Sequence, residues 1–187
     1  MKEKYFYHVV TEKPMFLGQH IIFDNNNYSG VYKRVLAKLN IVNDIYNNPN
    51  KYKHIILDHH TKVALRELAM EEVRKEKYPN YPSRLSCLYV STNLADALMW
   101  ADSFTKNERI VYQIVKLKHN GNEFTGDAYN CFEGSINKEE NIKNAHNYWL
   151  DNENNTNHNP IYETIIDGDI EVIEIIKEYN NTNKKAH

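Results

Sequence analysis

The chain has 187 residues, enough for one domain with a buried core, and its 41% hydrophobic and 26% charged residues are ordinary for a globular protein. A formal net charge of −2 excludes a global electrostatic case for binding nucleic acid or an anionic membrane. With two cysteines, Cys87 and Cys131, and no Cys-x-x-Cys pair, the chain cannot form a disulfide framework, and we expect no metal.

The start of the chain and its apolar stretches bear on where we expect the protein to be found. The first residues, Met-Lys-Glu-Lys-Tyr-Phe-Tyr-His, lack the apolar run of a secretory signal. No stretch is long and apolar enough to span a bilayer, so we expect a cytoplasmic protein without a membrane partner. We expect a single domain over residues 1–179 and a frayed tail over residues 180–187.

Periodicity predicts short strands and two helices in the first half of the chain. Weak alternation predicts a strand over 4–10, which carries His8, and a second strand over 19–24. Apolar residues then recur at helical spacing over 31–45. A second amphipathic helix is predicted over 61–76 and is ended by the prolines that follow it.

The second half continues to alternate strands with helices. The predicted elements are a strand over 86–91, a short helix to residue 101, a strand over 109–118, a helix over 136–150, and strands over 161–166 and 170–177. The asparagine-rich stretch 151–159 is interpreted as a mobile loop, and Asp167-Gly168 as a hairpin between the last two strands. The fold class is therefore α+β, without a regular doubly wound sheet.

Asp58-His59-His60 resembles a metal-ligand triplet because it follows a short apolar run. A two-metal phosphoesterase site needs further aspartates on other strand ends, and the early chain offers no matching Asp-x-Asp. We therefore interpret Asp58 or Thr61 as the start of the second helix, with exposed histidines in its first turn.

Four residues on separate predicted elements form the strongest candidate site. His8 ends the first strand and Glu163 opens a late one. Tyr89 lies in a strand and Trp100 eleven residues on, in the next helix, so a strand–turn–helix unit can place the two rings on either side of a flat heterocycle. Taken singly, they are also explained as an interior histidine, two core aromatics and a solvated strand end.

The order and spacing of these residues resemble diphtheria-toxin-like and poly-ADP-ribose-polymerase-like ADP-ribosyltransferases. In that superfamily a histidine lies on the first strand, Tyr-x10-aromatic spans a strand and a helix, and a glutamate opens a late strand. Leu88-Tyr-Val-Ser91 resembles the family's Gly-Ile-Tyr-Phe-Ala, and Glu163-Thr-Ile-Ile-Asp167 resembles its Glu-Tyr-Ile-Val-Tyr-Asp. The chain looks like a small bacterial branch of the superfamily, and the resemblance implies a split β-sheet core with helices inserted between short strands.

The resemblance also implies an activity, NAD-dependent mono-ADP-ribosyl transfer through an oxocarbenium-like ribosyl transition state. Glu163 would accept a hydrogen bond from the ribose 2′-hydroxyl and stabilise the developing positive charge. His8 would bind the adenosine-side ribose. Tyr89 and Trp100 would sandwich the nicotinamide, and backbone groups of Val9 would meet its carboxamide.

Other residues carry interpretations that stay open. Arg84 either contacts the NAD pyrophosphate as a planar fork or forms a salt bridge that pins its loop. Tyr148 is a candidate for lining the acceptor side, although an aromatic there is more often core. Two departures from the family pattern are Val9, where glycine is usual, and Ile161, where arginine-modifying members carry an acid. Arginine is therefore not expected as the acceptor.

The acceptor itself stays open among protein, nucleic acid and water. Water would make the protein an NAD glycohydrolase, and an RNA 2′-phosphate would make it a phosphotransferase. The latter resembles a family with several arginines around its phosphates, whereas this chain has five in all. A non-catalytic nucleotide-binding module is an alternative of a different class, and Val9 is the residue that favours it.

Overall fold

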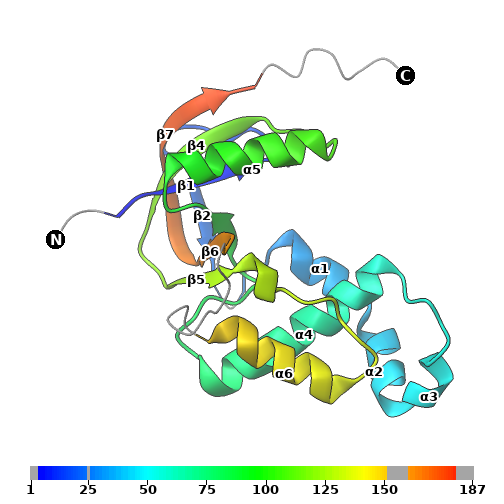
Figure 1. The fold of residues 1–187 in the computed structure, drawn as a ribbon. Coiled ribbons are helices and arrows are strands. Elements are labelled where there is room, and N and C mark those ends of the chain that lie inside the picture. The colour runs from blue at the N-terminus through cyan, green and yellow to red at the C-terminus, as the bar shows by residue number, and fades with distance from the viewer. Residues whose placement is uncertain (1–3, 25, 151–159, 180–187) are drawn as a thin grey trace.

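A computed structural model describes residues 4–24, 26–150 and 160–179. Within these residues the protein is an α+β fold with six α-helices and seven strands in two antiparallel sheets (Figure 1). The helices are α1 (Gly30–Leu36), α2 (Leu39–Asn47), α3 (Pro49–Tyr52), α4 (His59–Lys77), α5 (Leu94–Lys106) and α6 (Lys138–Trp149). The strands are β1 (Phe6–Val10), β2 (His20–Phe23), β3 (Leu88–Val90), β4 (Gln113–His119), β5 (Glu123–Asp127), β6 (Tyr162–Ile166) and β7 (Gly168–Glu178).

The seven strands divide between a four-stranded sheet with the order β1-β4-β7-β2 and a three-stranded sheet with the order β3-β6-β5. The hydrophobic core between the two sheets joins β1, β4 and β7 of the first to β3 and β6 of the second. Its fully or nearly fully buried members are Phe6, Val10, Val90, Val115, Leu117, Ile166, Ile170 and Val172. The two sheets therefore share one hydrophobic cluster, although their strands form two separate sheets.

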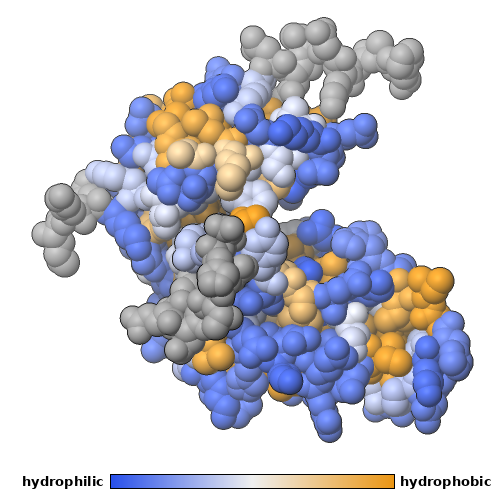
Figure 2. All heavy atoms as spheres, viewed as in Figure 1, coloured by the Kyte–Doolittle hydropathy of each residue, from blue (hydrophilic) through white to orange (hydrophobic). Residues whose placement is uncertain are grey.

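Helices cover the sheets unequally, and the molecule consists of two masses joined at a narrower middle (Figure 2). The upper mass holds the four-stranded sheet and α5, which packs on it through a cluster that includes Val9, Ala97, Ala101 and Ile114 (Figure 1). The lower mass holds the remaining helices. The three-stranded sheet lies at the junction (Figure 1).

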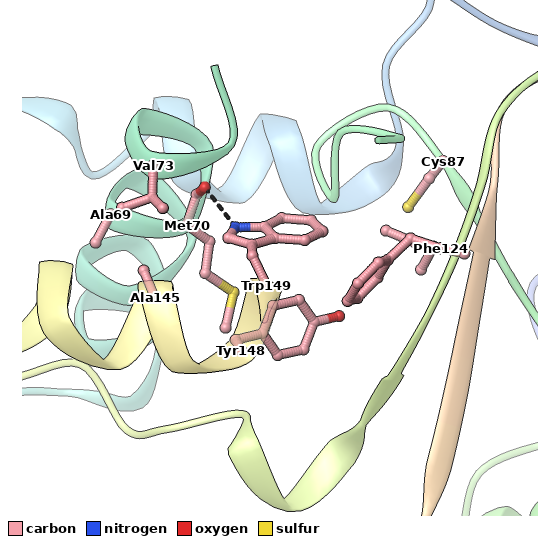
Figure 3. Packing of buried hydrophobic residues seen from close by; sticks show 9 residues of the cluster. Ala69, Met70, Val73, Cys87, Phe124, Ala145, Tyr148 and Trp149 are labelled. Carbon is pink, nitrogen blue, oxygen red and sulfur yellow. Dashed lines mark hydrogen bonds between the residues drawn. The ribbon is translucent and has the colours of Figure 1, made fainter. Parts of the chain in front are cut away.

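Large buried aromatics fix the helical layer against the three-stranded sheet (Figure 3). Tyr148 and Trp149 end α6 and pack against Phe124 of β5 and Ile165 of β6. The Trp149 indole Nε1 donates to the Met70 carbonyl of α4 at 2.8 Å, so the buried indole nitrogen has a partner. This packing places the end of α6 directly against the sheet that carries Glu163.

Most of the predicted elements are confirmed, with shifted ends. The helix predicted over 31–45 is in fact two helices, because the backbone at Lys38 leaves the helical region between α1 and α2. Strand β5 and the short helix α3 were not predicted. β5 is short, includes Gly126 and two acidic residues, and so lacks the apolar alternation of a recognisable strand.

The hairpin predicted at Asp167-Gly168 is wrong. β6 pairs with β3 and β5, whereas β7 pairs with β4 and β2, so the chain crosses from one sheet to the other at this point. Gly168 has a φ of +79°, and a Cβ on it would lie 2.7 Å from the Gly121 Cα. A glycine before an alternating run marks a tight turn, but it does not say which partner the next strand takes.

The interpretation of Asp58-His59-His60 as a helix start is confirmed. Asp58 is the N-cap of α4, where its Oδ1 accepts from the Thr61 amide at 3.0 Å and its Oδ2 from the Thr61 hydroxyl at 2.7 Å. His59 and His60 are exposed in the first turn. In the part of the chain that the structure describes, no helix has both the length and the apolar character needed to cross a membrane.

Candidate functional site

Among the described residues, one backbone pair bridges β1 and the end of β3, and no further pairing between these two strands is found beside it. The Tyr7 amide donates to the Ser91 carbonyl at 2.9 Å, and the Ser91 amide donates to the Tyr7 carbonyl at 2.8 Å. Because backbone groups alternate sides along a strand, Val9 directs its amide and carbonyl to the same edge as Tyr7, away from β4. Among the described residues, no backbone partner for Val9 is found at that edge. At this edge Val9 therefore has one backbone donor and one backbone acceptor without a backbone partner, although the residue is buried, with an exposed fraction of 7%.

The imidazole of His8 lies between β1 and β3 at this edge. Its Nδ1 is 2.7 Å from the carbonyl oxygen of Tyr89. A carbonyl can only accept, so Nδ1 carries the hydrogen and Nε2 of the neutral ring is an acceptor. Burial lowers the pKa of His8, and the hydrogen bond to Tyr89 only partly opposes this effect. The ring is therefore neutral at pH 7 and presents an acceptor nitrogen.

Tyr89 and Glu163 lie on neighbouring strands and on the same face of the three-stranded sheet. Tyr89 pairs with Ile165, and Glu163 is two residues before Ile165 on β6, so the three side chains share a face. Arg84 contacts both: its guanidinium carbon lies 5.4 Å from the centre of the Tyr89 ring, and its Nη1 lies 2.5 Å from Glu163 Oε1. The predicted stacking residue and the predicted catalytic residue are therefore brought together.

Arg84 is buried, with an exposed fraction of 4%, and each nitrogen of its guanidinium has a protein partner. Nε and Nη2 donate to the two oxygens of Glu67 at 2.9 and 3.3 Å. Nη1 donates to Glu163 and to the Tyr148 hydroxyl. Of the two interpretations of Arg84, a salt bridge or a contact to the NAD pyrophosphate, the structure shows the salt bridge. The donors of Arg84 are directed inward and not towards an outside phosphate.

The two carboxylate oxygens of Glu163 are in different situations. Oε1 accepts from Arg84 and also from the Tyr148 hydroxyl, which lies 2.6 Å away. For Oε2 no hydrogen-bond partner is found among the described residues. Among the described residues, the Tyr179 hydroxyl is the one side-chain N or O atom that is both fully shielded from solvent and without a hydrogen-bond partner. Oε2 has no partner but is not such an atom, so it contacts solvent. One oxygen is held by the protein and the other is open.

The charges below Glu163 compensate one another. Burial raises the pKa of Glu67, but Arg84 and Arg66 outweigh burial and hold that pKa below its ordinary value. Burial lowers the pKa of Arg84, but Glu163 and Glu67 raise it well above its ordinary value. Burial raises the pKa of the Tyr148 hydroxyl well above its ordinary value, so this hydroxyl remains a donor. The clamp on Oε1 is therefore in place throughout the neutral range.

Trp100 lies apart from this network. It is half-buried on α5, packs against the cluster that holds the Val9 side chain, and has Phe104 as its ring neighbour at 5.8 Å. Tyr89 packs instead with the aromatic cluster around Trp149. Among the described residues no ring contact joins Tyr89 to Trp100. The structure therefore brings together His8, the Val9 backbone, Tyr89, Arg84 and Glu163, and it packs Trp100 on the other face of β1.

Glu67 is the site residue that the sequence reasoning missed, and Tyr148 was considered only for the acceptor side. Glu67 is 1% exposed although the pattern of α4 suggests a polar position. The signal was present: at three-residue spacing Glu67 falls between Ala64 and Met70, which are buried. An acid within the buried stripe of a helix predicts a buried cationic partner.

A separate hollow of about 240 Å³ lies at the other end of this network. Its lining includes Arg66, which donates to Glu67, and Cys131, whose sulfur lies 3.9 Å from Arg84 Nη2. Burial raises the pKa of the Cys131 thiol despite the two nearby arginines, so the thiol is not an activated nucleophile. Glu163 does not line this hollow.

In a comparison with protein families, residues 6–178 match the model described as a protein of unknown function, DUF2441. The chain therefore belongs to the DUF2441 family. Comparison with curated proteins gives no match.

Proposed function

We propose that this member of the DUF2441 family is an NAD-dependent mono-ADP-ribosyltransferase that binds NAD at the edge where the pairing of β1 with β3 stops. The observation that carries the proposal is the state of Glu163, whose Oε1 is held by Arg84 and Tyr148 while Oε2 is open to solvent. A carboxylate fixed in this way is preorganised for a ligand hydroxyl, and its orientation costs nothing when the ligand binds.

The chemistry follows from the charge that develops in the transition state. When the bond between nicotinamide and its ribose breaks, positive charge spreads over the sugar, as in glycoside hydrolysis. Oε2 of Glu163 accepts a hydrogen bond from the ribose 2′-hydroxyl and lies near this charge. The interaction is stronger in the transition state than in the ground state, so it accelerates bond cleavage.

The same edge supplies complementary groups for the rest of the dinucleotide. The amide and carbonyl of Val9 match the carbonyl and amine of a carboxamide, and the Tyr89 ring offers a face for the nicotinamide. Nε2 of neutral His8 accepts a hydrogen bond from an adenosine-side ribose hydroxyl. The Val9 side chain packs towards α5 with Ala97 and Ala101, so it does not crowd the carboxamide.

A non-catalytic nucleotide-binding module is the second candidate, and Arg84 favours it. The guanidinium is paired with Glu163, and this positive charge offsets part of the negative field that a ribosyl cation would feel. Glu67 shares the same guanidinium and is also paired with Arg66, so the four groups together carry no net formal charge. The choice between transferase and binding module therefore depends on turnover.

The test is nicotinamide release from NAD by the whole chain, followed by mass analysis of the products. Glu163→Gln is expected to lower the release rate by about a hundredfold or more, because it removes the charge that stabilises the transition state. Glu174→Gln, on the exposed surface of β7, is the control and is expected to retain wild-type turnover. NAD binding without release in the wild type would favour the binding module, and neither binding nor release would reject both readings.

Trp100 has its own test, because its role rests on the resemblance alone. If its indole forms the second face of the nicotinamide site, Trp100→Ala weakens NAD binding by about tenfold or more in calorimetric titration. The circular dichroism spectrum is expected to stay as in the wild type. Normal NAD affinity in a folded Trp100→Ala protein would remove Trp100 from the site and leave Tyr89 as its aromatic face.

A further inference from the structure

The buried groups beneath Glu163 do not touch the ligand in the proposed chemistry, yet their hydrogen bonding to one another is complete. Arg84 and Glu67 are both almost fully buried, and Glu67 is held in turn by Nε and Nη2 of Arg66 at 3.0 and 2.8 Å. Buried charges carry a desolvation cost that a simple apolar core would avoid. An arrangement of this kind is therefore expected to serve the one member that reaches solvent, Glu163.

We propose that Tyr148 and Arg84 are positioning residues that select which oxygen of Glu163 faces the ligand. Both donate to Oε1, from different directions and different elements: Tyr148 from the last turn of α6, and Arg84 from the segment before β3. A carboxylate with one oxygen held twice cannot rotate freely about its last torsion, so Oε2 stays directed outward. Glu67 fixes the plane of the Arg84 guanidinium through Nε and Nη2, leaving Nη1 for Glu163.

The inference rests on the proposed function, and it makes a separate prediction about kinetics. Tyr148 does not touch the ligand in this scheme, so loss of its hydroxyl changes the orientation of Oε2 and leaves the groups that bind NAD intact. Tyr148→Phe is therefore expected to lower kcat for nicotinamide release by about ten- to a hundredfold, with KM for NAD changed less than about twofold.

The matched control is Tyr46→Phe. Tyr46 is partly buried, whereas Tyr148 is fully buried; like Tyr148 it has a hydroxyl with a side-chain partner, here Asn141 Nδ2 at 2.8 Å, but it has no contact with Glu163. It reports the effect of removing a hydroxyl from the helical layer. Equal loss of kcat in Tyr46→Phe and Tyr148→Phe, or unchanged kcat in Tyr148→Phe, would overturn the positioning role.

A second measurement separates this inference from the proposed function. In protein with ¹³C-labelled glutamate, the carboxyl resonance of Glu163 is assigned as the signal missing in Glu163→Gln. Tyr148→Phe is expected to shift this resonance, and Tyr46→Phe is expected to leave it in place. If the wild type releases no nicotinamide, the proposed function fails, and the resonance then decides alone: an unmoved signal in Tyr148→Phe overturns the positioning role.

Discussion

Replacing Glu67 by alanine is the sharpest test of the buried charges. The substitution removes an acceptor that is 1% exposed and receives two hydrogen bonds from Arg84 and two from Arg66. Arg84 then remains buried with Glu163 as its single charged partner. We expect a large loss of stability because the cationic side chain is left without most of its compensation.

The magnitude follows from which groups can recover water. Removing one partner of a buried ion pair costs about 3–5 kcal/mol. Arg66 is 21% exposed and can rehydrate, and Arg84 keeps Tyr148 and Glu163, so we expect the lower end, about 3 kcal/mol. For a domain of this size the melting temperature would fall by roughly 6–12 °C.

Urea unfolding followed by tryptophan fluorescence, to which Trp100 and Trp149 contribute, and by far-ultraviolet circular dichroism measures this loss. The control is Glu72→Ala on the same helix, which removes an exposed acid paired with Lys138 at 3.0 Å. Its cost is expected to stay below about 1 kcal/mol, as for surface ion pairs in general. A Glu67→Ala protein within about 1 kcal/mol of that control would refute the argument that the buried network carries stability.

Three further predictions concern His8, the turn at Gly168 and the core. Burial lowers the pKa of His8 from 6.5, so the unfolded chain takes up a proton first as the pH falls. The free energy of unfolding is therefore expected to decrease below about pH 6.5. His8→Gln is expected to flatten this part of the plot of unfolding free energy against pH. Gly168→Ala is expected to lower the free energy of unfolding in urea by about 2–3 kcal/mol, because it adds a clash with Gly121 to an unfavourable φ. The control is Gly18→Ala, which has a similar φ and open space around it and should cost only about 1 kcal/mol. Trp149→Phe leaves a cavity and removes the hydrogen bond from the indole to the Met70 carbonyl, so we expect the melting temperature to fall by roughly 4 °C or more. A melting temperature within about 2 °C of wild type would contradict the packing described for Trp149.

Local patterns predicted the elements of the fold better than their pairing. Alternation and helical spacing are properties of the chain itself, so β1, α4 and β7 could be recognised from them. The crossing of the chain between the sheets at Gly168 could not, since an alternating strand reads the same whichever sheet it joins. β5 was missed because its pairing with β6, and not its own propensity, makes it a strand.

The candidate site shows the same division. The sequence identified residues whose type suggests chemistry, and the placement of His8, Tyr89 and Glu163 on strands is as predicted. It could not assign Arg84, because its partner Glu67 is seventeen positions earlier, and the buried spacing of Glu67 on α4 predicts a cationic partner without saying which one. The role of a buried cation is decided by neighbours that only the packed fold brings together.

The end of the pairing between β1 and β3 has a consequence for how a ligand would be held. If the bridge between Tyr7 and Ser91 continued, the seven strands would form one sheet in the order β5-β6-β3-β1-β4-β7-β2. The His8 ring occupies the Tyr89 carbonyl at the first position where the ladder would go on, and Val9 is left with its hydrogen-bonding groups unused. A bound carboxamide would therefore stand in for a missing residue of that ladder, held by the same hydrogen-bonding geometry that joins one strand to the next.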